Sequence, residues 1–266
     1  MRVQLPGAAI EVEDHGEGVP LVLLHGFPLS GEIWVPLRPA LEEVARVVTP
    51  DLRGFGRSDK PAGSYAMEVL ADDVAALADL LALDRFVLGG HSMGGYVALR
   101  FAAAHRERLL GLLLVDSRAE ADTDEARAGR NAAIETIGRE GPVAFLDAFV
   151  PKLVGPSTRA RAPRFLAELR ALAEEVPAHV LAAALAGMRD RPDSSPLLTG
   201  LDLPVLVLVG AEDSLIPVAQ AEKLVRGLPR GELVTVPEAG HTPSVERPVV
   251  TGEAVTAFLR RHFAGL

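Results

Sequence analysis

Ser92 stands in the pentapeptide Gly90-His91-Ser92-Met93-Gly94, which matches the pattern glycine-x-serine-x-glycine. The apolar residues 86–88 before it predict a buried strand, and residues 96–105 after it predict a helix. A strand that reverses directly into a helix forces the turn residue into a strained backbone with φ > 0, which small neighbours two positions away accommodate. We therefore expect the Ser92 hydroxyl to stand clear of the sheet as a nucleophile, beside the Met93 amide at the start of the helix. The pentapeptide alone also fits an ordinary glycine-rich turn, so its partners decide the interpretation.

A serine hydroxyl is a poor nucleophile at neutral pH and needs an adjacent base to take its proton. Among the seven histidines, His241 is the candidate base, because it follows the last predicted strand in Glu238-Ala239-Gly240-His241-Thr242-Pro243. The alternative is an exposed loop histidine. His91 is too close to Ser92 in sequence to act as its base. The remaining histidines are assigned to a loop, a turn, helix ends or the inserted helices: His25, His15, His105, His262 and His179.

The base needs a buried carboxylate that fixes its tautomer and stabilises its cationic form. Asp213 is the candidate acid, because it follows a predicted strand and precedes the apolar segment Leu215-Ile216-Pro217, which would bury it. Its neighbour Glu212 is the simplest competitor, and Asp116, at the end of the preceding strand, is a second candidate acid. With Asp213 the chain order is serine, acid, histidine, as in hydrolases with this type of turn.

A tetrahedral oxyanion needs two converging N–H donors. We expect one from the Met93 amide and the other from the Phe27 amide, in the loop His25-Gly26-Phe27-Pro28 that follows an apolar strand. Pro28 has no N–H to offer. His25 has no second ligand at metal-binding spacing and is expected to hydrogen-bond the loop. We expect no metal and no cofactor.

Composition narrows the class of protein. With 27 Lys and Arg against 36 Asp and Glu, the formal charge is −9, which does not favour a nucleic acid or an anionic membrane as partner. Cysteine is absent, which excludes disulfides, thiolate zinc sites and cysteine nucleophiles. No apolar run reaches the ~18 residues of a membrane span, and residues 1–7 lack the apolar stretch of a secretory signal. We therefore expect a cytoplasmic enzyme that acts on a small molecule.

Apolar strands alternate with helices along most of the chain. Residues 2–13 predict an edge hairpin, and a helix is expected at 67–83 and another at 248–263. Buried strands are predicted at 19–24, 46–49, 86–88, 109–115, 203–209 and 232–236. Near-continuous apolar strands separated by helices indicate a mostly parallel sheet of about eight strands covered on both faces. Such α/β sheets carry their sites at the carboxyl ends of the strands.

One interval breaks this alternation. Residues 117–199 contain no strand pattern; instead four helical segments are expected, at 122–140, 142–154, 164–176 and 177–189. We interpret them as a lid over the site, so that 1–116 and 200–266 form the core. Most lid aromatic and methionine side chains are expected to pack internally, with a minority facing the cleft. Arg118, Arg189 and Arg191 could meet a substrate carboxylate, although solvated surface charge is the favoured interpretation.

Taken together these motifs resemble the α/β-hydrolase superfamily over nearly all of the chain outside the lid, and most closely its small carboxylesterases, which are grouped with 3-oxoadipate enol-lactonases. The resemblance implies an oxyanion loop at His25-Gly26-Phe27-Pro28, a structural loop at Asp51–Ser58, and Ser92, Asp213 and His241 as nucleophile, acid and base. Dehalogenases and epoxide hydrolases of the superfamily have aspartate where Ser92 stands, which disfavours those chemistries.

The expected reaction is transfer of an acyl group from a small ester to water through an acyl-enzyme. An apolar pocket with few charges near Ser92 is expected, which favours uncharged esters. An enol-lactone hydrolase or a cofactor-free perhydrolase using the same three residues are the alternatives within this chemistry. A non-catalytic ligand-binding member of the fold is the alternative of a different class.

Overall fold

The computed structural model describes residues 1–265, and its centre is one eight-stranded sheet in the order β1-β2-β4-β3-β5-β6-β7-β8. The β1–β2 and β2–β4 pairs are antiparallel, and every pair from β4 to β8 is parallel. This confirms the predicted edge hairpin and the mostly parallel sheet. The strands are β1 Arg2–Leu5, β2 Ala8–His15, β3 Val19–Leu24, β4 Ala45–Pro50, β5 Phe86–His91, β6 Leu109–Val115, β7 Val205–Gly210 and β8 Gly231–Val236.

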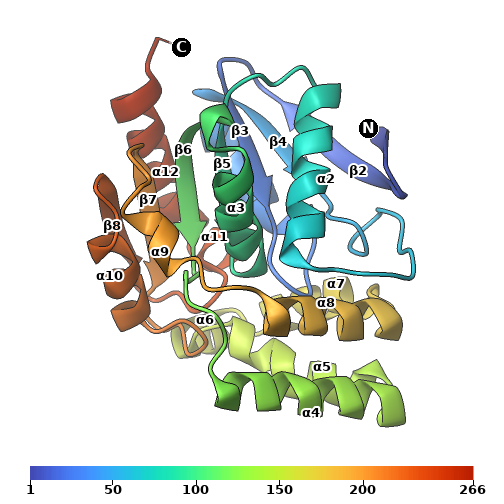
Figure 1. Ribbon diagram of the computed structural model, residues 1–266. Helices are drawn as coiled ribbons and strands as arrows, with labels where there is room; N and C mark the ends of the chain where they lie inside the picture. Colours follow the sequence, from blue (N-terminus) through green and yellow to red (C-terminus); the bar gives the residue numbers. More distant parts are fainter. Residues whose placement is uncertain (266) are drawn as a thin grey trace.

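The strands in the middle of the sheet are apolar because both of their faces are covered. All residues of β5 and β7 are buried, and so are all residues but one of β6. In Figure 1, α2 and α3 lie together over the sheet, and α3 packs against β5, the strand that leads into it. The helices of this part of the chain are η1 Gly31–Leu37, α1 Arg38–Leu41, α2 Met67–Leu80, α3 Met93–Ala104, η2 Arg106–Arg108, α10 Val218–Arg226, α11 Pro243–Glu246 and α12 Pro248–Phe263.

The segment between β6 and β7 contains helices and no strand, as predicted. Figure 1 shows α4, α5, α7 and α8 as a group at one edge of the sheet, where the arrowhead of β6 points. The four predicted segments correspond to these helices, whereas the short α6 and α9 were not predicted because four to six residues carry no helical periodicity. The helices are α4 Asp124–Glu140, α5 Pro142–Phe149, η3 Val150–Leu153, α6 Pro156–Arg161, α7 Arg164–Glu174, α8 Ala178–Asp190 and α9 Ser195–Leu198.

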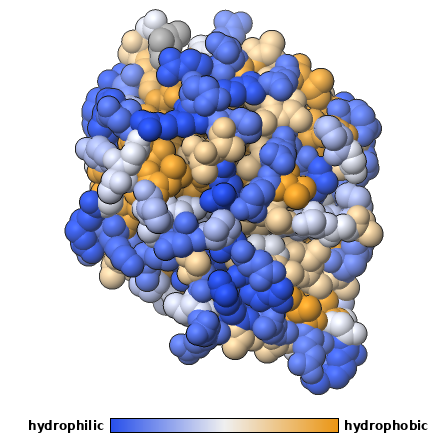
Figure 2. All heavy atoms as spheres, viewed as in Figure 1, coloured by the Kyte–Doolittle hydropathy of each residue, from blue (hydrophilic) through white to orange (hydrophobic). Residues whose placement is uncertain are grey.

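The surface is mixed in polarity. On the face drawn in Figure 2, hydrophilic side chains surround small apolar areas. The large apolar side chains that are exposed come from separate segments of the chain: Met1, Val35, Leu80, Val143 and Val249. Within residues 1–265 no single helix is both long and apolar enough to span a membrane, and α7 with α8 meets that test only as a pair bent by 97°.

Candidate active site

Ser92 occupies the sharp turn between β5 and α3, with φ 50° and ψ −111°. This is the strained, positive-φ backbone that the sequence predicts. The two flanking glycines are required by contact, since a Cβ on Gly90 would lie 2.1 Å from the Gly94 carbonyl oxygen. A Cβ on Gly94 would lie 2.6 Å from the carbonyl oxygen of Leu24, at the end of β3. The turn therefore presses directly against the loop that follows β3.

That loop carries one of the two predicted oxyanion donors, the N–H of Phe27, and the other is the N–H of Met93. Met93 is the first residue of α3, so its N–H has no acceptor within the helix and points out of its N-terminus. Phe27 lines the same cavity as Ser92. The imidazole of His25 fixes the loop, because its Nδ1 bonds to the Gly26 carbonyl at 3.0 Å and its Nε2 accepts the Leu52 N–H at 3.0 Å. The expected hydrogen-bonding role of His25 is thus confirmed, while the pairing of Phe27 and Met93 as an oxyanion hole stays a prediction.

Asp213 and His241 form a buried pair. His241 Nδ1 lies 2.7 Å from Asp213 Oδ2, and the side chains are 2% and 0% exposed. Asp213 Oδ1 accepts the N–H groups of Leu215 and Ile216 at 2.7 and 3.1 Å, so the apolar segment buries the acid as expected. Burial opposes ionisation, but the charge and hydrogen bond of His241 outweigh it and lower the pKa of Asp213. A carboxylate is therefore in place to orient the imidazole.

Asp116, the second candidate acid, lies beside this pair. One donor atom each of Asp116, Asp213 and His241 lies within 4.8 Å of the others. Asp116 is fully buried, and its Oδ1 accepts the Gly210 N–H at 2.9 Å. Burial raises the pKa of Asp116 well above its usual range, and repulsion by the Asp213 carboxylate raises it further. Burial and the neighbouring carboxylate therefore favour the neutral form of Asp116, whereas Asp213, with its lowered pKa, is the carboxylate in contact with the histidine.

His91 connects the two halves of the site, a role that the sequence did not indicate. Its Nε2 donates to the His241 carbonyl oxygen at 2.5 Å, across 150 residues of sequence. Burial, followed by repulsion from His241, lowers the pKa of His91 to about 3. The ring is thus neutral and holds the His241 loop against the Ser92 turn. Its bond to the backbone of His241 agrees with the expectation that His91 does not act as the base.

Glu246 is a second residue that the sequence did not single out, because it lies in the short helix α11. It is buried, and its Oε1 accepts the N–H groups of Gly240 and Thr242 at 2.9 and 3.0 Å, on either side of His241. Its Oε2 accepts the N–H of Gly155, in the inserted helices, at 2.9 Å. Glu246 therefore fixes the histidine loop to both parts of the chain. Glu212 makes a similar link, to Ser157, rather than pairing with a histidine.

We expect Glu246→Gln to lower the melting temperature by about 3–12 °C. The amide places an NH₂ group against one of the N–H donors, so that a charge-assisted bond worth about 1.5–3 kcal/mol is lost in a buried place, and for a chain of this size about 1 kcal/mol shifts the midpoint by ~2–4 °C. Thermal unfolding followed by circular dichroism measures the change. Glu253→Gln, on the exposed side of α12, is the control, with an expected shift of about 1 °C or less. Equal midpoints for the two variants would contradict the assigned role.

Ser92 and His241 line one cavity of about 140 Å³. It is small beside the roughly 300–1,000 Å³ typical of pockets for drug-sized ligands. Its wall includes Phe149 and Met188 from the inserted helices, which agrees with the expectation that a minority of their large side chains face the cleft. The remaining lining residues are Phe27, Tyr96, Arg118, Arg130, Leu215 and Ile216.

The expectation that few charges lie near Ser92 is wrong, because Arg118 and Arg130 both line this cavity. Arg130 was not singled out, since its position in a charged helical segment resembles a solvated face. Arg191 is buried, against the favoured interpretation of surface charge. Arg189 agrees with that interpretation, as it is paired with Asp190 on the outside.

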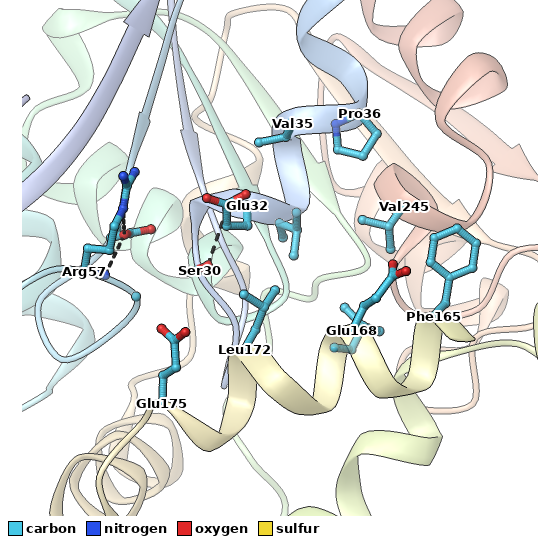
Figure 3. A pocket seen from close by; sticks show the side chains of 14 residues that line it. Ser30, Glu32, Val35, Pro36, Arg57, Phe165, Glu168, Leu172, Glu175 and Val245 are labelled. Atoms are coloured by element: carbon cyan, nitrogen blue, oxygen red, sulfur yellow. Dashed lines mark hydrogen bonds and ion pairs between the residues drawn. The ribbon is translucent and has the colours of Figure 1, made fainter. Parts of the chain in front are cut away.

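A larger cavity of about 530 Å³ lies elsewhere, between η1, the Asp51–Ser58 loop and α7 (Figure 3). Glu32, Glu168 and Glu175 are among the labelled side chains around it, together with the apolar Leu172, Phe165 and Val245. The Asp51 carboxylate is occupied by the N–H groups of Gly31 and Arg57, at 2.8 and 2.9 Å. These bonds support the structural role expected for the loop, and the smaller cavity, which Ser92 and His241 line, is the candidate site.

The comparisons with known proteins agree with this geometry. A family model described as the alpha/beta hydrolase fold matches residues 19–248. A solved thermophilic esterase from Thermogutta terrifontis, with malate bound, superposes with a TM-score of 0.95 at 40% identity and covers 99% of this chain and 100% of its own. The enol-lactonase from Burkholderia xenovorans LB400 has a TM-score of 0.90 at 27% identity, with 97% and 99% covered.

Among curated proteins, the pimeloyl-[acyl-carrier protein] methyl ester esterase of Aeromonas hydrophila is 33% identical over 263 residues, 94% of this chain and 99% of that protein. The chain spans 64% of the length of a longer relative from Pseudomonas putida, to which it is 34% identical. The match of the family model over most of the chain, together with a nucleophile turn, a parallel sheet and similar esterases, shows that this chain belongs to the alpha/beta hydrolase family.

Proposed function

We propose that this hydrolase cleaves small carboxylic esters through an acyl-enzyme formed on Ser92. The observation that carries the proposal is the buried Asp213–His241 pair, at 2.7 Å, whose histidine opens onto the same cavity as a serine held in a strained turn. The similarity to esterases supports the reaction class. The inserted helices, residues 117–199, would act as a cap that forms one wall of the cavity and limits access of water.

In the first half of the reaction, the Ser92 oxygen attacks the ester carbonyl carbon while His241 takes the hydroxyl proton through Nε2. The carbonyl oxygen becomes an oxyanion, which the N–H groups of Phe27 and Met93 would bind. The C–O bond to the alcohol then breaks, and the histidine gives its proton to the leaving alkoxide. Asp213 stabilises the imidazolium throughout, as its lowered pKa keeps it ionised.

In the second half, water takes the place of the alcohol. His241 removes a proton from water as the oxygen attacks the acyl carbon, and the Ser92 oxygen leaves with that proton. The products are a carboxylic acid and the free enzyme. An enol-lactone would follow the same path with acid and leaving oxygen in one molecule, and the similarity to an enol-lactonase favours it as the second candidate. With peroxide in place of water, the acyl-enzyme would give a peracid.

The test is hydrolysis of 4-nitrophenyl esters from acetate to decanoate, followed by release of nitrophenolate. We expect the highest kcat/KM with the short acyl groups, because the cavity of about 140 Å³ has no room for a long chain. Purified enol-lactones and peroxide-dependent halide oxidation are assayed in parallel. No turnover of any ester, or a preference for the longest chains, would contradict the proposal.

A further inference from the structure

Three guanidinium groups share one buried carboxylate beside the Ser92 cavity. Asp122, whose side chain is fully buried, accepts from Arg118 Nη2 at 2.8 Å and from Arg191 Nη1 at 2.7 Å, and its other oxygen accepts from Arg130. Burial opposes ionisation of Asp122, but the hydrogen bonds and charges of Arg130 and Arg191 lower its pKa. Three positive charges against one negative charge leave this cluster with a formal excess of two.

The three arginines are not equivalent. Arg191 is not among the residues that line the Ser92 cavity, and it also donates to the carbonyl oxygens of Met188 and Glu120 at 2.6 and 2.8 Å and stacks on the Tyr96 ring at 4.0 Å. Arg118 and Arg130 instead line the cavity that holds Ser92 and His241. Their side chains are 21% and 19% exposed, so they lie largely out of bulk water but open to the cavity.

Arg118 and Arg130 both have N–H groups without a strong hydrogen-bond acceptor. Arg118 Nε is buried and has no hydrogen-bond partner anywhere in residues 1–265. Arg130 Nη1 has only the Met188 sulfur, 3.6 Å away, and a thioether is a weak acceptor. A guanidinium group carries five N–H donors, and leaving them unpaired out of water is unfavourable. Arg118 and Arg130, which both line the cavity, therefore each keep an N–H donor without a strong acceptor in residues 1–265.

We propose that Arg118 and Arg130 form a subsite for a carboxylate carried by the ester substrate, so that the preferred substrates are small esters with a free carboxylate group. The inference rests on the proposed ester hydrolysis at Ser92. A planar carboxylate matches the fork of a guanidinium group and pairs with it more strongly than a neutral acceptor does. The size of the cavity, about 140 Å³, requires the carboxylate to lie only a few atoms from the scissile carbonyl.

The test compares esters that differ in charge but not in shape. Monoethyl succinate is matched with ethyl succinamate, in which a neutral amide replaces the carboxylate on the acyl side. Acetoxyacetate is matched with 2-acetoxyacetamide, which makes the same change on the alcohol side. We expect the wild type to prefer one carboxylate ester over its amide by roughly 10- to 100-fold in kcat/KM, and the pair that shows the preference identifies the side that carries the charge.

Variants separate substrate binding from support of the fold. Arg118→Gln and Arg130→Gln are expected to lower the carboxylate-over-amide ratio about tenfold or more, mainly through KM, and Arg118→Lys to keep part of it. Arg189→Gln is the matched control, since Arg189 is a lid arginine paired with Asp190 on the surface. An unchanged ratio in the glutamine variants, or equal preference for both esters by the wild type, would overturn the carboxylate subsite.

Binding to Ser92→Ala protein, measured by calorimetry, makes the outcome independent of turnover. Tighter binding of a carboxylate ester than of its amide supports the subsite even if the wild type hydrolyses no ester. That absence of hydrolysis would contradict the proposed function alone. Equal binding of both members in each pair, or no binding of either, would overturn the subsite and leave ester hydrolysis to be judged from the nitrophenyl series.

Discussion

Ser92→Ala is expected to reduce ester turnover by on the order of 10⁶-fold, the loss seen when a serine hydrolase loses its nucleophile. The reason is that His241 and the N–H donors have no covalent chemistry of their own once the hydroxyl is gone, and only binding and oxyanion stabilisation remain. Steady-state release of nitrophenolate from 4-nitrophenyl acetate measures the effect.

The fold of this variant is expected to be unchanged, because alanine has the same backbone restriction as serine at φ 50°. Ser64→Ala, at an exposed loop position, is the control and is expected to keep full turnover. If Ser92→Ala retained more than about a hundredth of wild-type turnover at an unchanged melting temperature, a different nucleophile would have to be sought.

Asp213→Asn is expected to reduce kcat by about 10⁴-fold, whereas Asp116→Asn should cost no more than about tenfold. An amide at Asp213 cannot stabilise the imidazolium and favours the wrong tautomer, although it has nearly the same shape. Burial raises the pKa of Asp116 and favours its neutral form, which an amide resembles in shape and charge. The Oδ1 that accepts the Gly210 N–H also has a counterpart in asparagine.

These two variants form a matched pair, since both replace a buried aspartate within 4.8 Å of the same imidazole. Their pH profiles add a second readout. A group with a lowered pKa stays ionised at all pH values above it, so protonation of Asp213 should not contribute to the loss of activity as pH falls toward the ordinary range of aspartate. A large loss in Asp116→Asn with a small loss in Asp213→Asn would exchange their roles.

The fold could be predicted from the sequence because several of its strands are continuous apolar segments. Leu109–Val115 and Val19–Leu24 are continuous apolar segments whose bounds coincide with β6 and β3. Helix α12 coincides with the predicted segment 248–263 for the same reason, a clear periodicity that begins at a proline. Helix α3 begins three residues earlier than predicted, since the nucleophile turn passes into the helix without a separate cap.

Ser92, Asp213 and His241 could be identified from local sequence patterns, whereas the residues that surround them could not. Ser92 needs nearby glycines, and Asp213 and His241 each follow a strand, so sequence spacing alone brings them to one edge. The contacts of His91 with His241 and of Glu246 with Gly155 join segments far apart in the chain, and no local pattern encodes them. Arg118 and Arg130 pair with the nearby Asp122, but the sequence does not show that Asp122 is buried or that both arginines line the cavity.

The most direct measurement is covalent labelling with a fluorophosphonate, followed by peptide mass spectrometry. Such a reagent forms a stable phosphonyl ester only with a serine activated by a base and an oxyanion hole. The account predicts one adduct per chain, on Ser92, and a labelling rate that falls sharply in Asp213→Asn but not in Asp116→Asn. An unlabelled Ser92 in folded wild-type protein, or an adduct on another serine, would contradict it.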